Sequence, residues 1–184
     1  MLNLTDHFLV AMPNLQDNFF TSSVVYVTRH TMMHGAVGVI INKPLGKKLK
    51  NAFADLDFSQ YNPNWSENLL YLGGPVSSDN GFVLHRTSAR QSNDDILFEL
   101  TGNRDVLTEI AQSNNKNDLF VSVGYTAWGA SQIEEEVCKN DWLVVKSDSS
   151  LIFDVDVDNR YNAALKQLGI SDPSRLYYGE DIIA

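Results

Sequence analysis

The sequence predicts one domain of the α+β class. Segments rich in β-branched and aromatic residues cluster along the chain, and helical patterns stand singly between them without regular strand–helix alternation. The chain has 184 residues, which is a usual length for one domain, and no Gly/Ser linker, charge block or internal repeat divides it. We therefore expect a single domain over residues 1–184, and not a doubly wound parallel sheet.

Three strands are expected near the beginning of the chain. Residues 8–12 form a short apolar run that stops at Pro13, because proline cannot donate a ladder hydrogen bond. Residues 24–28 are rich in β-branched and aromatic side chains. Residues 36–41 follow after a turn at 30–35, so we expect a hairpin whose second strand is buried on both faces.

A turn and a helix are expected next. The Asn42-Lys43-Pro44 segment forces the chain to turn, because the residue before a proline avoids the helical region. Leu49, Phe53 and Leu56 are spaced as i, i+4 and i+7, which places one apolar stripe on a helix. We expect that helix over residues 47–56.

Three further strands are predicted in the middle of the chain, at residues 69–72, 82–84 and 96–100. Asp79-Asn80-Gly81 indicates a turn before the second of them, because Asn-Gly tolerates positive φ angles. Asn103 is a suitable cap for a helix whose apolar face extends to Ala111.

The last third is predicted to contain a strand, a helix, two strands and a final helix, at residues 119–123, 131–139, 142–146, 151–157 and 159–168. Residues 124–129 are expected to form a loop before the first of these helices. Ser131 and Glu134 fit a capping box, in which each side chain bonds a free backbone N–H of the first turn. Gly169 is a typical C-terminal stop for the final helix.

The overall charge disfavours direct DNA binding by the whole surface. The formal charge is −9, from 14 basic and 23 acidic side chains. Nucleic-acid binding draws most of its affinity from lysine and arginine side chains that neutralise phosphates. Lys43, Lys47, Lys48 and Lys50 form the only basic cluster, and they are expected to lie on the solvated face of the predicted helix. A nucleic-acid-binding regulator acting through this cluster stays open as an alternative.

We expect a cytoplasmic protein without membrane segments. Cys138 is the only cysteine, so the chain cannot form an internal disulfide or a cysteine-based zinc site by itself. The first residues lack the charged and apolar regions of a signal peptide, and no apolar run approaches the ~20 residues that a membrane helix needs.

Four segments in order resemble the YqgE/AlgH family, and together they span most of the chain. They are residues 8–13 with 23–26, residues 35–44, residues 73–76 with 81–85, and residues 124–128 with 132–134. The resemblance implies a partly barrel-like mixed sheet with a few flanking helices, in a cytoplasmic bacterial protein. It offers no catalytic residues, because the family is described as uncharacterised. One branch carries a name linked to exopolysaccharide regulation, and transcriptional regulation is suggested for the family.

The expected loop 124–129 is the first candidate for ligand binding. Tyr125 and Trp128 are able to stack on a planar ligand, and glycines leave backbone N–H groups open. The acidic run 134–136 in the following helix would repel a phosphate, so a neutral or cationic ligand fits better. The alternative is a tight turn in which both aromatic rings fill the core.

These observations favour a non-catalytic regulatory or interaction protein with a small-ligand or protein partner. The candidate binding residues are Asn42, Gly74, His85, Tyr125 and Trp128. A hydrolase that uses His85 with a nearby carboxylate is the alternative from another functional class.

Cofactor and metal sites are not expected. The Gly73-Gly74-Pro75 segment lacks the Gly-Lys-Ser/Thr of a P-loop, so it predicts a structural close approach of backbone. His30 and His34 are four residues apart but lie in a predicted turn, and no partner carboxylate motif accompanies them. The acidic run that begins at Asp154 has Asn159 and Leu165 where a calcium loop needs Gly and Glu.

Overall fold

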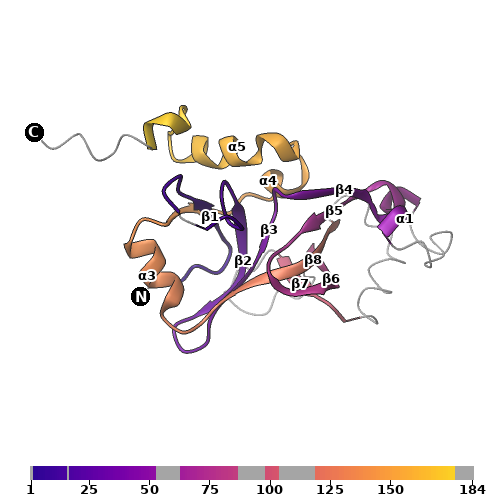
Figure 1. Ribbon diagram of the computed structural model, residues 1–184, viewed down its shortest axis with the longest axis horizontal. Helices are drawn as coiled ribbons and strands as arrows, with labels where there is room; N and C mark the ends of the chain where they lie inside the picture. Colours follow the sequence, from indigo (N-terminus) through magenta and orange to yellow (C-terminus); the bar gives the residue numbers. More distant parts are fainter. Residues whose placement is uncertain (1, 16, 53–62, 87–97, 104–118, 177–184) are drawn as a thin grey trace, which may run out of the picture.

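The computed structural model describes residues 2–15, 17–52, 63–86, 98–103 and 119–176 (Figure 1). The strands are β1 (His7–Ala11), β2 (Val24–Thr31), β3 (Gly35–Ile40), β4 (Pro44–Lys48), β5 (Leu69–Leu72), β6 (Val76–Arg86), β7 (Phe98–Thr101), β8 (Leu119–Trp128) and β9 (Trp142–Lys146). The α-helices are α1 (Leu49–Ala52), α3 (Gln132–Cys138), α4 (Ser149–Phe153) and α5 (Arg160–Gln167). Short 3₁₀ turns are η2 (Pro63–Glu67), η3 (Val157–Asn159) and η4 (Pro173–Leu176).

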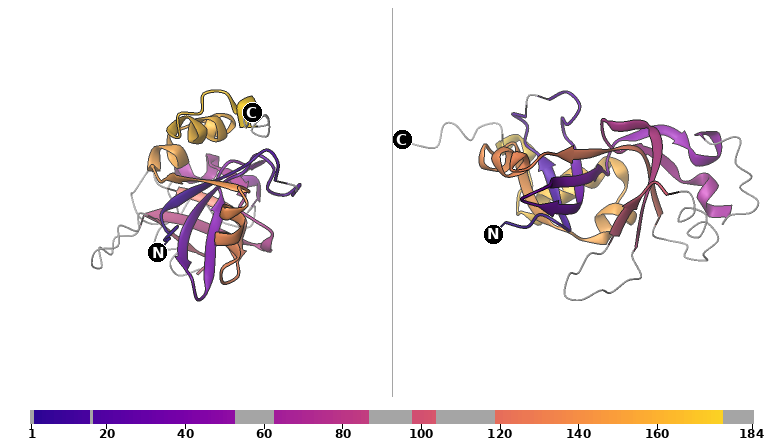
Figure 2. Two further views of the ribbon diagram at one scale, coloured as in Figure 1. Left: turned by 90° about the vertical axis from the view of Figure 1, so that its left-hand side faces the viewer. Right: turned by 90° about the horizontal axis from the view of Figure 1, so that it is seen from below.

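The strands form one mixed sheet, which confirms the predicted α+β class. Seven strands follow one another in the order β4-β5-β8-β3-β2-β1-β9, while β6 pairs with β8 and also with β7. The β5–β8 pair is parallel, and the other strand pairs are antiparallel. The sheet is strongly curled (Figure 2), in agreement with the expected partly barrel-like form.

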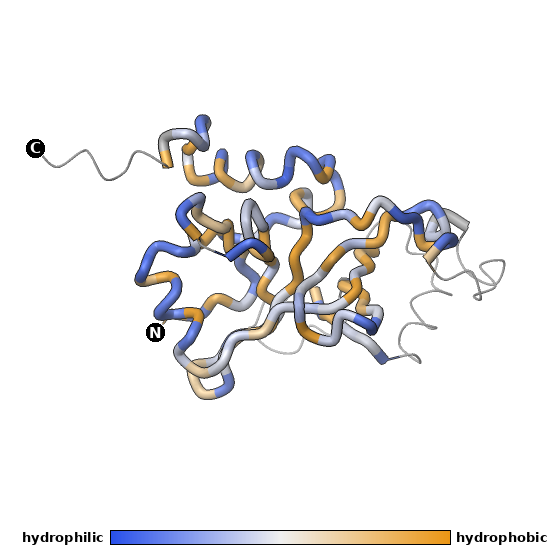
Figure 3. The backbone as a smooth tube through the Cα atoms, viewed as in Figure 1, coloured by the Kyte–Doolittle hydropathy of each residue, from blue (hydrophilic) through white to orange (hydrophobic). Residues whose placement is uncertain are grey.

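The central strands are covered on both faces, as their apolar sequences indicate. Phe8, Val10 and Tyr26 point toward α4 and α5, whereas Leu9 and Val25 belong to the cluster that contains α3. This division follows from the two-residue period of a strand, which sends neighbouring side chains to opposite faces. Figure 3 shows hydrophobic residues concentrated along these strands, with hydrophilic residues at the β4–α1 junction.

The predicted helix at 47–56 is wrong in its first part. Residues 44–48 form the exposed edge strand β4, and the helical turn α1 begins only at Leu49. Pairing with β5 gives this segment its backbone hydrogen-bond partners, an influence that periodicity within the segment does not reveal. Residues 53–56 lie outside the described residues.

The predicted turn at Asp79-Asn80-Gly81 is also wrong, because β6 runs through it. The pairing register between β6 and β8 shifts between Val76 and Gly81, so the extra residues form an irregularity within the strand and not a reversal. The strand expected at 96–100 is observed as β7 from Phe98 onward. The helix expected after Asn103 lies outside the described residues.

The expected strand at 151–157 is a short helix followed by a 3₁₀ turn. Asp148 accepts a hydrogen bond from the backbone N–H of Ser150 at 3.0 Å, and this cap starts α4. The alternation of acids and valines in this region imitated a strand. The final helix α5 is confirmed, and Gly169 follows it with a positive φ of 77°.

Strand β8 joins two parts of the sheet, and residues 124–128 belong to it instead of forming the predicted loop. Its first part pairs with β5 and β6, and its last three residues pair with β3. The change of partner occurs next to Gly124, where φ is 69°. A Cβ atom there would lie 2.2 Å from the carbonyl oxygen of Gly74, so the backbones approach closely. The predicted structural role of the Gly73-Gly74 pair is thereby explained.

A carboxylate holds two tryptophan rings in the core beneath α3. The indole N–H groups of Trp128 and Trp142 donate to the same oxygen of Glu136, at 2.9 and 2.8 Å. The rings contact each other edge to face, with centroids 6.0 Å apart, and Phe20 contacts both. Glu136 therefore satisfies two polar groups that the aromatic cluster would otherwise leave buried and unpaired.

Among the described residues, no helix combines the length and apolar character required to cross a bilayer.

Substitution of Gly124 tests the close approach of β8 to Gly74. Gly124→Ala should lower the free energy of unfolding by about 2–4 kcal/mol, because positive φ costs about 1 kcal/mol and overpacking adds about 1–3 kcal/mol. Gly46→Ala is the matched control: its φ is 67°, but its Cβ would meet nothing within 4 Å. Urea denaturation measures both, and equal losses would contradict the proposed steric role.

Removal of the Glu136 carboxylate tests the polar centre of the aromatic cluster. Glu136→Ala should cost about 2–4 kcal/mol of stability and change the tryptophan fluorescence, because two buried indole N–H groups lose their acceptor. Glu135→Ala changes an exposed neighbour on the same helix and should stay within about 0.5 kcal/mol of the parent. Similar thermal and denaturant midpoints for the two variants would refute this role.

Candidate functional site

A cavity of about 400 Å³ lies between the α4–α5 region and the β5–β8 part of the sheet. Charged, polar and apolar residues contribute to its lining, and the exposed surface of the lining is mostly polar. The lining residues are Asn68, Leu69, Tyr71, Leu119, Phe120, Ile152, Phe153, Asp154 and Arg160. This volume lies toward the lower end of the range usual for small-molecule sites.

Arg160 contributes a buried guanidinium group to this cavity. It is the first residue of α5 and lies on the same face as Ala164 and Leu165, with only 5% of its surface exposed. Its Nε donates to the carbonyl oxygen of Val155 at 3.1 Å, and its Nη1 donates to that of Ile41. These bonds occupy two of the five guanidinium donors and fix the orientation of the group.

The hydrogen bonds of Arg160 to Val155 and Ile41 are made to neutral backbone carbonyl groups. Among the residues that the structure describes, no carboxylate forms an ion pair with Arg160. Burial lowers the pKa of Arg160 from its ordinary value, while Tyr71 and Asp156 act in the opposite direction. Arginine nevertheless stays protonated in proteins, so the cavity contains a permanent cation.

Two stacked aromatic rings form one side of the cavity. The rings of Tyr71 and Phe120 have centroids 4.3 Å apart at an interplanar angle of 29°, and both residues are buried. The guanidinium carbon of Arg160 lies 5.3 Å from the centroid of Tyr71, within the range of a cation–π contact. The arginine is therefore held by an aromatic face as well as by two carbonyl oxygens.

The arrangement suits binding of a carboxylate better than chemistry on it. A guanidinium presents parallel N–H groups that match the two oxygens of a carboxylate. The residues that line the cavity include no serine, cysteine or histidine, so this part of the described chain supplies no usual nucleophile or imidazole base.

Two of the sequence-predicted site residues have structural contacts near the β3–β5 junction. The Asn42 side chain accepts from the Val24 N–H and donates to the Ser22 carbonyl, both at 2.8 Å. Gly74 packs directly against the backbone of Tyr125, where a Cβ atom would approach to 2.1 Å. Both residues thus stabilise contacts between neighbouring backbone segments, and neither lines the described cavity.

The other three predicted residues, Tyr125, Trp128 and His85, lie in different parts of the structure. Trp128 is 5% exposed in the aromatic cluster, and Tyr125 contacts Phe82 with centroids 5.1 Å apart. Tyr125 and Trp128 are three positions apart along β8, an odd spacing that places the rings on opposite faces, so they cannot stack on one ligand. His85 lies on β6, opposite Glu99 of β7 and Leu119 of β8. The structure therefore brings Gly74 and Tyr125 together, but not all five residues.

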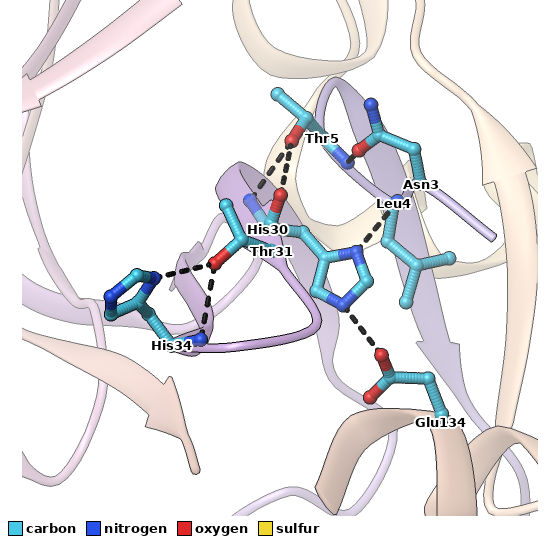
Figure 4. Close-up of polar contacts among 7 residues, drawn as sticks. All are labelled: Asn3, Leu4, Thr5, His30, Thr31, His34 and Glu134. Carbon is cyan, nitrogen blue, oxygen red and sulfur yellow. Dashed lines mark hydrogen bonds and ion pairs between the residues drawn. The ribbon is translucent and has the colours of Figure 1, made fainter. Parts of the chain in front are cut away.

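Buried His30 and partly buried Glu134 form a pair that replaces the predicted capping box (Figure 4). His30 Nδ1 accepts from the Leu4 N–H at 3.1 Å, so Nε2 carries the proton that is donated to Glu134 at 3.0 Å. Ser131 has φ 63° and makes no capping bond with its side chain. The box was predicted from spacing alone, but Glu134 bonds a residue 104 positions away.

The histidines do not assemble a metal centre in the described part of the chain. His34 Nδ1 lies 3.2 Å from the Thr31 hydroxyl in the β2–β3 turn, away from the His30–Glu134 contact in Figure 4. The described residues contain no group of three or more potential metal-binding side chains among His, Cys, Asp and Glu.

Most of the basic cluster is engaged within the protein. Lys48 and Lys50 both pair with Glu67, and they lower the pKa of that carboxylate to about 2, chiefly through their hydrogen bonds. Lys43 donates to the Phe19 carbonyl and lies over its ring. Only Lys47 of the four cluster members has no such contact among the described residues, so internal contacts engage three of the four lysines.

Arg160 was not among the predicted site residues, although the sequence contains a signal for it. In the predicted helix 159–168, Arg160 occupies the stripe shared with Ala164 and Leu165, where an apolar residue is expected. A charged residue on an apolar stripe indicates a buried partner or a binding site. The aromatic and backbone partners of Arg160 come from distant segments, so their identity required the structure.

Comparisons with known proteins agree with this architecture. The profile of the family described as AlgH-like matches residues 8–172. A UPF0301 protein of Chromobacterium violaceum is 41% identical over 180 residues, and the alignment covers 95% of this chain and 95% of the relative. UPF0301 protein VP2612 of Vibrio parahaemolyticus is 38% identical over 184 residues, with coverage of 95% of this chain and 96% of the relative.

Two solved structures have the same fold. The solution structure of the AlgH protein from Pseudomonas aeruginosa superposes with a TM-score of 0.73 at 33% identity, covering 95% of this chain and 93% of that protein. The crystal structure of protein DIP2367 from Corynebacterium diphtheriae gives a TM-score of 0.66 at 18% identity, covering 91% and 88%, and shows the fold alone. The chain described here belongs to the AlgH-like family, as its sequence motifs indicated.

Proposed function

We propose that this protein is a non-catalytic, cytoplasmic regulatory protein that binds a small carboxylate-bearing ligand at Arg160. The carrying observation is the buried guanidinium, which lines a cavity of about 400 Å³ and is held in place by backbone carbonyl oxygens. Such a group is preorganised, so a carboxylate can bind without the cost of ordering a flexible arginine side chain.

The charge of the whole chain supports a small ligand over a polyanion. A net charge of −9 repels phosphate-rich molecules at a distance, whereas one carboxylate gains more from the cation inside the cavity. The pairing of Lys48 and Lys50 with Glu67 also removes support from the nucleic-acid alternative.

The position of His85 gives less support to the hydrolase alternative than Arg160 gives to binding. Glu99 lies opposite His85 in the sheet, which supplies a carboxylate neighbour. His85 itself, however, is not among the residues that line the described cavity. A substrate in that cavity would therefore lie against Arg160 and not against the histidine.

The location of the cavity offers a simple route to regulation. Arg160 links the start of α5 to the end of β3 through Ile41, and to the α4–α5 connection through Val155. A ligand bound between these elements and β5–β8 would stabilise their arrangement by mass action. Partner proteins that contact α4 or α5 would then meet a surface whose order depends on the ligand.

Replacement of Arg160 tests the proposed binding group. With 3-phenylpropionate as the probe, we expect Arg160→Lys to weaken binding by about 10- to 100-fold, because a charge-assisted hydrogen bond contributes about 1.5–3 kcal/mol. Arg29→Lys, at an exposed position of β2, should bind as the parent does. Isothermal titration calorimetry measures the affinities, and circular dichroism checks that each variant is folded.

A second variant keeps this test decisive if Arg160→Lys fails to fold. Leu119→Trp adds bulk at a half-buried lining position while retaining the arginine, so it should abolish probe binding. Ala127→Trp, at an exposed position of the same strand, is the control. Unchanged binding by Leu119→Trp, or absence of binding by the parent, would exclude this cavity as the site.

A further inference from the structure

We infer that the ligand is a zwitterion of the α-amino-acid type, an inference that rests on the proposed function. The cavity contains a second charge of opposite sign, because Asp154 also lines it. Arg160 is buried, whereas Asp154 is exposed. A ligand carboxylate would thus bind deep in the cavity while its ammonium group stays near the mouth.

The local backbone holds the two charges close enough for one small molecule. Arg160 Nε donates to the carbonyl of Val155, the residue directly after Asp154. Since consecutive Cα atoms are about 3.8 Å apart, the Cα of Asp154 lies within about 10 Å of the guanidinium. Among the described residues the two side chains form no ion pair with each other, so each charge can serve the ligand.

The position of Asp154 is fixed by the fold. Asp154 ends α4, and its backbone N–H donates to the Ser150 carbonyl at 2.8 Å. The neighbouring helix residues Ile152 and Phe153 contribute apolar lining on the same side. The anionic group therefore projects from an ordered helix end, as a specific binding site requires.

The rest of the lining contributes little to selection of the ligand's side chain, because Phe120 and Ile152 are almost completely buried. Five apolar residues contribute to the cavity, namely Leu69, Leu119, Phe120, Ile152 and Phe153. The two charged residues Arg160 and Asp154 therefore define the class of ligand.

The net charge of the protein also favours a zwitterion over a simple anion. A molecule without net charge approaches a surface of charge −9 without long-range repulsion. Within the cavity, Asp154 opposes a simple carboxylate but attracts the ammonium group of an amino acid. Asp154 thus favours a zwitterion over a simple carboxylate as the ligand.

Three matched probes test the inference by calorimetry. L-phenylalanine carries both charges, 3-phenylpropionate carries only the carboxylate, and 2-phenylethylamine carries only the ammonium group. We expect L-phenylalanine to bind about tenfold more tightly than either partial analogue. Asp154→Asn should remove this advantage over 3-phenylpropionate without weakening the binding of that acid, and Asp158→Asn, another exposed acid, should preserve it.

Each outcome separates this inference from the proposed function. Equal affinity of the parent for L-phenylalanine and 3-phenylpropionate would overturn the zwitterion preference while leaving carboxylate binding intact. Binding of 2-phenylethylamine as tightly as L-phenylalanine, or an advantage that survives in Asp154→Asn, would also overturn it. If neither carboxylate-bearing probe binds the parent, the proposed function fails as well.

Discussion

The guanidinium group of Arg160 must find hydrogen-bond acceptors inside the protein, because burial of an unpaired charge is very unfavourable. It finds them in the carbonyl oxygens of Val155 and Ile41, and its flat face lies near the ring of Tyr71. These contacts connect the end of β3, the α4–α5 connection and β5, three segments far apart in sequence. Because the acceptors are neutral, the group retains a net charge that a ligand carboxylate can use.

The sheet provides the other side of the same cavity through the unusual course of β8. Close approach of Gly73 and Gly74 to Gly124 allows β8 to pair with β5 and β6 at one end and with β3 at the other. The Tyr71–Phe120 stack belongs to the β5–β8 part, beneath α4 and α5. The glycines therefore act through the backbone and position a site in which they take no direct part.

The elements with strong local patterns could be predicted from the sequence, whereas those decided by distant partners could not. Local apolar patterns predict several elements correctly: apolar runs predict β1, β2, β3 and β9, and an apolar stripe predicts α5. In contrast, Glu134 fitted a cap by spacing but bonds His30, and the glycine-rich segment 124–128 resembled a loop but is extended by its strand partners. The same limit applies to Arg160: sequence shows a charge on an apolar stripe but not the cavity that it faces.

The most direct measurement of the central claim is an NMR titration that follows the arginine side-chain Nε–Hε resonances with L-phenylalanine. If Arg160 is the carboxylate-binding group, its Nε–Hε resonance should shift in a saturable manner, with the same dissociation constant as the calorimetric binding. The exposed Arg29 serves as the internal reference and should not shift. Saturable binding that leaves the Arg160 resonance in place would contradict the account.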